Sequence, residues 1–231
     1  MQVFTATNSE IESGFLNEVE SKHCVRVLRK LVGDEINITN GEGTLFKAVI
    51  TDANQKKCAF NITSSEEYHK HAPPLHIAIA PTKNIDRFEF FLEKATEIGI
   101  SEITPIQCFH SERKVVKEER LSKIISSACK QSNNFHFPKL NKLTSITEVL
   151  SLDTKNKFIA HCSVNEKIEL KSLKLKEETL ILIGPEGDFS KEEIEHALSN
   201  GFQPISLGES RLRTETAGIV ACTIVNLNYE K

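Results

Sequence analysis

Hydrophobic and polar residues alternate in short runs over the first 67 residues of the chain, as they do in strands with one buried face. The alternation is clearest at 35–39, and the Asn40-Gly41 pair directly behind it favours a tight hairpin turn. Two further runs, at 44–51 and 58–63, continue the pattern. Short strands joined by tight turns predict a small β-barrel in this part of the chain.

Beyond residue 74 the pattern lengthens, and wholly apolar runs alternate with amphipathic segments. Residues 75–80 are typical of a buried strand, whereas 85–98 carry apolar side chains at helical spacing. Further strands are expected at 102–108, 158–161, 180–183 and 204–207, and further helices at 121–128, 191–200 and 216–227. Strands separated by helices predict the α/β class, with a parallel sheet and helical crossovers.

The change of pattern also predicts two domains. A plausible linker, His71-Ala72-Pro73-Pro74, separates them. We therefore expect the β-barrel over residues 1–70 and the α/β domain over residues 75–231.

Two loops near the C-terminal end are the best candidates for a ligand site. The apolar run Leu180–Ile183 indicates a strand buried on both faces, and it leads into the glycine-rich stretch 184–187. A second strand ends at Leu207-Gly208. In an open α/β sheet, small molecules bind beyond the carboxyl ends of the strands, and glycines let the main chain approach them closely. The two loops therefore predict one shared site.

Each loop also has a plainer explanation. On local pattern alone, 184–190 is equally well an ordinary turn between a strand and a helix, and Thr214-Glu215-Thr216 could simply cap an apolar helix. The phosphate-loop pattern Gly-x-x-x-x-Gly-Lys-Ser/Thr and the dinucleotide pattern Gly-x-Gly-x-x-Gly are both absent. Their absence argues against a nucleotide-hydrolysing enzyme.

Composition narrows the class of protein further. The six cysteines are scattered without any Cys-x-x-Cys pair, so we expect neither a disulfide framework nor a zinc site. His69 and His71 have no third ligand nearby, and no metal is expected. The polar N-terminal stretch is unlike a signal sequence, and no apolar run reaches the length of a membrane span. The expected location is the cytoplasm, with no membrane partner.

The formal net charge of −3 is unusual for a nucleic-acid-binding protein, because neutralising phosphates supplies much of the affinity. Any RNA site must therefore be local. Basic residues do cluster, although each cluster alone is more typical of a solvated helix face. The clusters are Arg26, Arg29 and Lys30; Lys83 and Arg87; Arg113, Lys114 and Lys117; and Arg211 and Arg213.

Four segments in order along the chain together point to a known family. They are HCVRVLR at 23–29, EKATEIGI at 93–100, LILIGPEGDFS at 180–190 and ISLGESRLRTETA at 205–217. In this order they resemble the RsmE-type 16S ribosomal RNA uracil-N3 methyltransferases of the SPOUT class. The chain departs from the family pattern at Asp188, where a second glycine is usual, and also at Ser210-Arg211 and 130–134.

The resemblance implies a C-terminal SPOUT methyltransferase domain with a trefoil knot and an N-terminal PUA-like β-barrel. It implies S-adenosylmethionine as the cofactor, 16S rRNA or the small ribosomal subunit as the partner, and a homodimer. The apolar positions of the last helix, which lie almost all round it, favour a dimer as well. The implied cofactor-binding residues are His161, Gly184, Pro185, Glu186, Gly187, Leu207, Gly208, Leu212, Arg213, Thr214, Thr216 and Ala217.

The reaction implied is transfer of a methyl group to N3 of a uridine, which must lose its proton first. Arg213 is the candidate for stabilising the charge that develops on the base. Glu186 or Glu215 is the candidate for accepting the proton or orienting the arginine, although Glu215 could equally cap the last helix and pair with Arg213. The candidate RNA-binding residues are Arg26, Arg29, Lys83 and Arg87.

Two other functions remain open on the sequence. Related SPOUT families methylate ribose hydroxyls or other bases, and the loops alone do not fix the acceptor. Alternatively, the chain could be a non-catalytic RNA-binding factor in ribosome assembly, which the departures at Asp188 and near Asn134 would favour if they abolished binding.

Overall fold

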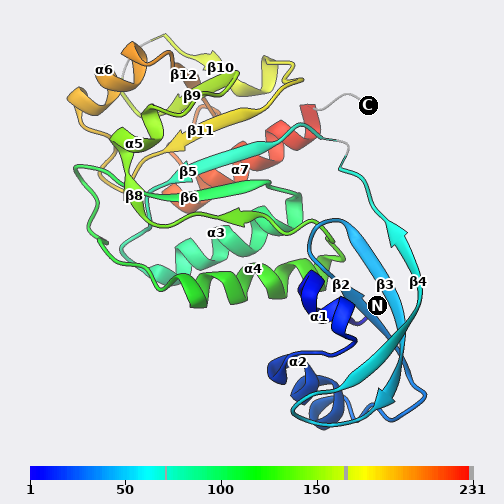
Figure 1. Ribbon diagram of the computed structural model, residues 1–231. Helices are drawn as coiled ribbons and strands as arrows, with labels where there is room; N and C mark the ends of the chain where they lie inside the picture. Colours follow the sequence, from blue (N-terminus) through cyan, green and yellow to red (C-terminus); the bar gives the residue numbers. More distant parts are fainter. Residues whose placement is uncertain (71, 164–165, 229–231) are drawn as a thin grey trace. The chain divides into compact units, whose positions relative to one another are not determined.

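The computed structural model describes residues 1–70, 72–163 and 166–228 (Figure 1). The chain forms two compact units, one made of residues 1–70 and 129–137, and the other of residues 71–128 and 138–231. The pattern of the sequence placed 129–137 in the second domain, whereas the structure joins this segment to the N-terminal unit.

The N-terminal unit is built on a four-stranded sheet in the order β1-β2-β3-β4. β1 and β2 are parallel, and the other two pairs are antiparallel. β2 has the predicted bounds, and the predicted Asn40-Gly41 turn joins it to β3. The strands are β1 (Val3–Thr5), β2 (Glu35–Thr39), β3 (Thr44–Asp52) and β4 (Ala59–Glu67).

Two short helices and one π-helical turn in this unit were not predicted. They are α1 (Asn8–Ser13), α2 (Glu18–Lys22) and the turn His23–Val27. Five or six residues are too few for a periodic pattern, so the hydrophobic positions gave no signal. The start of α1 does have a local signal, the capping box of Thr7 and Glu10. The Thr7 hydroxyl accepts a hydrogen bond from the Glu10 amide at 3.3 Å, and the Glu10 carboxylate accepts one from the Thr7 amide at 2.8 Å.

Residues 129–137 complete the N-terminal unit through main-chain and apolar contacts. The Phe137 amide donates to the Gly41 carbonyl at 2.8 Å, and the Gly43 amide donates to the Phe135 carbonyl at 2.8 Å. The Phe135 side chain is buried with Val3 and Leu45. The segment therefore supplies hydrogen bonds to the turn between β2 and β3, some ninety residues earlier, and core to β1 and β3.

The second unit contains a sheet in the order β10-β12-β9-β11-β5-β6-β7, with β8 paired to β6. Every recorded pair is parallel, which confirms the predicted α/β class. Its strands are β5 (Leu75–Ile79), β6 (Glu102–Gln107), β7 (Lys139–Leu140), β8 (Thr144–Ser145), β9 (Asn156–Ala160), β10 (Ile168–Glu169), β11 (Thr179–Ile183) and β12 (Gln203–Ser206).

Helices lie against both faces of this sheet. On one face α5 and α6 pack over Ala78, Leu180 and Leu182. On the other, α7 packs against α3 and β5 so closely that a Cβ at Gly218 would lie 2.6 Å from the Phe91 ring. The helices are α3 (Ile85–Ile98), α4 (Glu118–Ser132), α5 (Ile146–Leu150), α6 (Lys191–Ser199) and α7 (Thr214–Asn228).

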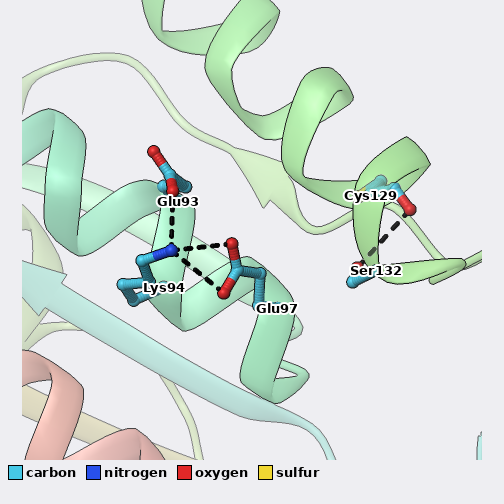
Figure 2. Close-up of polar contacts among 5 residues, drawn as sticks. All are labelled: Glu93, Lys94, Glu97, Cys129 and Ser132. Atoms are coloured by element: carbon cyan, nitrogen blue, oxygen red, sulfur yellow. Dashed lines mark hydrogen bonds and ion pairs between the residues drawn. The ribbon is translucent and has the colours of Figure 1, made fainter.

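Local signals set the helix ends. α3 has the predicted bounds and ends at Gly99, whose φ of +115° disfavours any other residue. α6 begins with the predicted capping box between Ser190 and Glu193. Figure 2 shows Lys94 of α3 donating to Glu93 at 2.7 Å and to Glu97 at 3.0 Å, and the Ser132 hydroxyl donating to the Cys129 carbonyl in the last turn of α4.

No helix within the described parts of the chain is both long enough and apolar enough to cross a membrane.

Candidate cofactor site

Three neighbouring strands of the second unit, β11, β9 and β12, run parallel and therefore end at the same edge of the sheet. The loops that follow them enclose a cavity of about 650 Å³. This volume lies in the ordinary range for sites that bind small molecules. The two predicted loops thus meet at one cavity, and the loop after β9 joins them.

Most of the predicted cofactor residues line this cavity. The loop after β9 contributes His161, and the loop after β11 contributes Gly184, Pro185 and Glu186. The loop after β12 and the start of α7 contribute the rest, namely Leu207, Gly208, Leu212, Arg213, Thr214 and Ala217.

Gly187, Thr216 and Glu215 are not among the residues that line the cavity. A Cβ at Gly187 would lie 3.0 Å from the Cβ of His110, in the loop after β6. The close approach of main chain at this position is therefore to His110. Thr216 is half-buried in the first turn of α7.

Asp188 ties two of the three loops together. Its Oδ2 accepts the Cys162 amide at 2.7 Å, and its Oδ1 accepts the Phe189 amide at 2.9 Å. Its φ of +66° is in the left-handed region, which aspartate tolerates better than most residues. Asp188 thus adopts a backbone conformation that glycine favours and adds a link between the loops after β9 and β11.

The loop after β12 is linked to the loop after β11 through Thr214, whose hydroxyl donates to the Gly184 carbonyl at 3.0 Å. Both groups are buried, so this hydrogen bond is shielded from competing water. The start of α7 is thereby fixed against the end of β11.

His161 is the most buried titratable side chain of the cavity wall, at 7% exposed. Burial lowers its pKa, and the nearby charge of Lys167 lowers it further, so the imidazole is neutral at physiological pH. Its Nδ1 lies 2.7 Å from the Ser163 hydroxyl. No hydrogen-bond partner for its Nε2 is found within the described residues.

The two candidate carboxylates have different surroundings. Glu186 is exposed at the cavity, and its Oε1 accepts the Lys83 amide at 2.9 Å. Glu215 is 8% exposed and pairs with Arg87, with Arg87 Nε 3.9 Å from Oε1. The ion pair described for Glu215 thus involves Arg87 rather than Arg213.

The candidate RNA-binding residues fall in both units. In the N-terminal unit Arg26 and Arg29 are exposed, and Arg29 has a φ of +57°. In the second unit Lys83 is exposed and lies 2.7 Å from Glu112, which raises the pKa of Lys83. Arg87 is half-buried in its contact with Glu215.

The predicted set missed several residues of the cavity wall, among them Asp188 and Lys167. Asp188 was noticed only as a departure from the family pattern. Lys167 reaches the wall because its ammonium group donates to the His161 carbonyl, and no sequence signal marks that contact. Among the described residues, no group of three or more His, Cys, Asp and Glu side chains is placed to hold a metal, and His71 lies outside those residues.

Two family models match the chain. The RNA methyltransferase domain matches residues 69–226, and the RNA methyltransferase PUA domain matches residues 16–63. The chain belongs to the RNA methyltransferase family. This result confirms the predicted family and the predicted enzyme class.

Relatives agree over nearly the whole chain. The ribosomal RNA small subunit methyltransferase E of Rickettsia conorii is 30% identical, and the match covers 96% of this chain and 91% of that protein. A probable rRNA-methyltransferase of Porphyromonas gingivalis is 42% identical with a TM-score of 0.89, covering 96% and 95% of the two chains. The ribosomal RNA small subunit methyltransferase E of Neisseria gonorrhoeae, solved bound to S-adenosyl methionine, is 25% identical with a TM-score of 0.85, covering 99% and 98%.

Replacing Asp188 should loosen this methyltransferase's cavity wall without unfolding the domain. Asp188→Ala removes both side-chain acceptors, and a hydrogen bond to a carboxylate contributes about 1.5–3 kcal/mol. Hydrogen exchange of the Cys162 and Phe189 amides should therefore accelerate by roughly 10- to 100-fold. Asp188→Asn is the matched control, because it tolerates the same φ and keeps one acceptor, so one of the two amides should remain protected. Unchanged exchange in Asp188→Ala would show that the carboxylate does not hold the loops.

Proposed function

We propose that this chain transfers a methyl group from S-adenosylmethionine to N3 of a uridine in the 16S RNA of the small ribosomal subunit. The observation that carries the proposal is the cavity at the carboxyl edge of β9, β11 and β12, which lies within the matched methyltransferase domain. Relatives are named for small-subunit ribosomal RNA, and one was solved with the cofactor bound.

The residues of the cavity fit this cofactor. Its wall includes Gly184, Leu207 and Gly208, whose main-chain amide and carbonyl groups can bind an adenine and a ribose. The neutral imidazole of His161 adds no repulsion against a sulfonium, and its buried Nε2 is available for a hydrogen bond. The cofactor supplies an electrophilic methyl group, so the protein's main contribution is alignment.

The chain's own side chains then prepare the uridine. Arg213 is exposed at the cavity, where its guanidinium stabilises negative charge on O2 or O4 of the base. Glu186, on the facing loop, accepts the N3 proton directly or through water. Glu215 does not contact the uridine itself; it holds the Arg87 side chain in place through their ion pair.

RNA affinity comes from local basic groups in the same proposal, because the chain as a whole is negatively charged. Arg26 and Arg29 of the N-terminal unit contact phosphates, as does Lys83 beside the cavity. The target base leaves its stack to reach the methyl group. A cytoplasmic location belongs to the proposal too, since ribosomal subunits are its substrate.

A homodimer and a trefoil knot complete the proposal. Support for the dimer comes from α7, where Ile219, Val220 and Ile224 remain half-exposed after one face has packed against α3 and β5. Support for the knot comes from the resemblance of the four sequence segments to the SPOUT class.

The acceptor can be tested by mass spectrometry of the nucleosides of ribosomal RNA. RNA from cells lacking the gene should lose 3-methyluridine, and the purified protein should restore it to isolated small subunits from those cells. Loss of a methylated ribose or guanine instead would identify a different acceptor. An unchanged nucleoside profile would favour a non-catalytic assembly factor.

Arg213 should affect the chemical step rather than RNA binding. Removing one preorganised group that stabilises developing charge costs roughly 100- to 1,000-fold in rate, so Arg213→Ala should lower the single-turnover rate at saturating RNA by that factor. The double variant Arg26→Ala with Arg29→Ala is the comparison, because it should weaken RNA binding and reduce its salt dependence while leaving the saturated rate near normal. Weaker RNA binding at an unchanged rate in Arg213→Ala would make Arg213 an RNA contact.

The oligomeric state should be a two-fold dimer. Light scattering at micromolar concentration should give a mass of twice 25.9 kDa. Ile224→Glu places a charge on the half-exposed face of α7 and should shift the mass towards the monomer, whereas Glu195→Lys, on the exposed surface of α6, should not. A monomeric mass for the unmodified chain would contradict the dimer.

A further inference from the structure

A bulky aromatic side chain stands in solvent directly after β6. Phe109 is 77% exposed, although phenylalanine is ordinarily among the most buried residues. Its ring meets the ring of the neighbouring His110 edge to face, with the centroids 5.0 Å apart and an interplanar angle of 80°. The two rings are therefore not stacked in parallel.

The backbone around Phe109 is held firmly. The Phe109 amide donates to Glu193 Oε1 at 2.7 Å, and the Cys108 amide donates to the Ser111 hydroxyl at 2.9 Å. Further along, Arg113 donates to the carbonyls of Thr82 at 3.0 Å and Lys83 at 2.6 Å. These bonds fix the backbone of the loop that carries the exposed ring.

The same loop adjoins the cofactor loop. His110 Nδ1 lies 3.0 Å from the Asp188 carbonyl, and the His110 Cβ lies 3.0 Å from the position of a Cβ on Gly187. Asp188 is part of the cavity wall. Phe109 is therefore one residue away from direct contact with the loop that encloses the proposed methyl donor.

Phe109 borders an acidic hollow and precedes a basic stretch of the chain. The hollow, of about 600 Å³, is lined by Gln107 and Thr147 and also by Glu192 and Glu193, whose carboxylates repel phosphates. The stretch that follows carries Arg113, Lys114 and Lys117, where phosphates could lie. Aromatic faces beside basic groups are the usual means of binding unpaired nucleotides.

We propose that Phe109 is a stacking platform for an unpaired base of the substrate RNA, next to the uridine that enters the cavity. The proposal rests on the proposed function for the RNA, and it adds a binding site outside the cavity. Extruding one base leaves its neighbour without a stacking partner, and a fixed exposed ring beside the cavity replaces that partner. Because stacking requires only a π face, the site accepts any base.

Fluorescence provides a direct test, because the natural chain contains no tryptophan. Phe109→Trp introduces a single reporter whose emission should be quenched saturably when an oligonucleotide carrying the target uridine binds. Phe90→Trp is the matched control, since Phe90 is 51% exposed in the same unit but lies on α3 beneath the ammonium group of Lys94. Quenching should be absent there. No quenching at position 109 during demonstrable RNA binding would overturn the proposal.

The affinity of Phe109 variants for the RNA distinguishes base stacking on the ring from a simple apolar contact. Phe109→Ala should raise the dissociation constant for the RNA by about 5- to 150-fold, which corresponds to the loss of one stacked base. Phe109→Leu, which keeps apolar bulk without a π face, should resemble the alanine variant, whereas Phe109→Tyr should resemble the natural chain. Full affinity in Phe109→Leu or Phe109→Ala would refute the stacking platform.

The platform and the proposed function can fail separately. S-adenosylmethionine binding should be equal in all Phe109 variants and the natural chain, which also shows that the variants fold. If the natural chain methylates ribosomal RNA and Phe109→Ala binds that RNA normally, only the platform is wrong. If the natural chain neither binds nor methylates the RNA, both are wrong.

Discussion

The parallel pairing of β11 between β9 and β5 is the constraint on which the rest of the structure depends. Every residue of β11 is buried, so the strand has no polar face and must be covered on both sides by helices. Parallel strands need crossover connections, which place every loop of one kind at the same edge. A binding cavity at that edge is thus a consequence of how helices cover the sheet. To give the cavity a fixed shape, the loops must only be linked to one another.

Two side chains tie these loops together, and one of them, Asp188, stands where the family pattern usually has glycine. Asp188 holds two loops through amide groups, and Thr214 holds the third through a carbonyl. Each link ends on the main chain, so the geometry of the cavity wall does not depend on the flexible end of a second side chain.

The sequence predicted those features that repeat over many residues. α3 and β2 have their predicted bounds because each shows a clear period, and most of the cavity residues were found because they lie within two adjacent loop motifs. Single long-range contacts could not be predicted in this way. The approach of His110 to Gly187, the pairing of Glu215 with Arg87, and the contact of Lys167 with the loop after β9 join residues whose separation in sequence carries no periodic signal.

The packing of Phe135 against Val3 and Leu45 determines when the N-terminal unit can complete its fold during synthesis. As the ribosome extends the chain, the first four strands emerge early, but the unit lacks part of its core until residue 137 has left the exit tunnel. By then β5, α3, β6 and α4 of the other unit have already been made. Residues 1–70 therefore do not form the complete N-terminal unit. A fusion protein that contained these residues alone would lack the part of the core that Phe135 supplies.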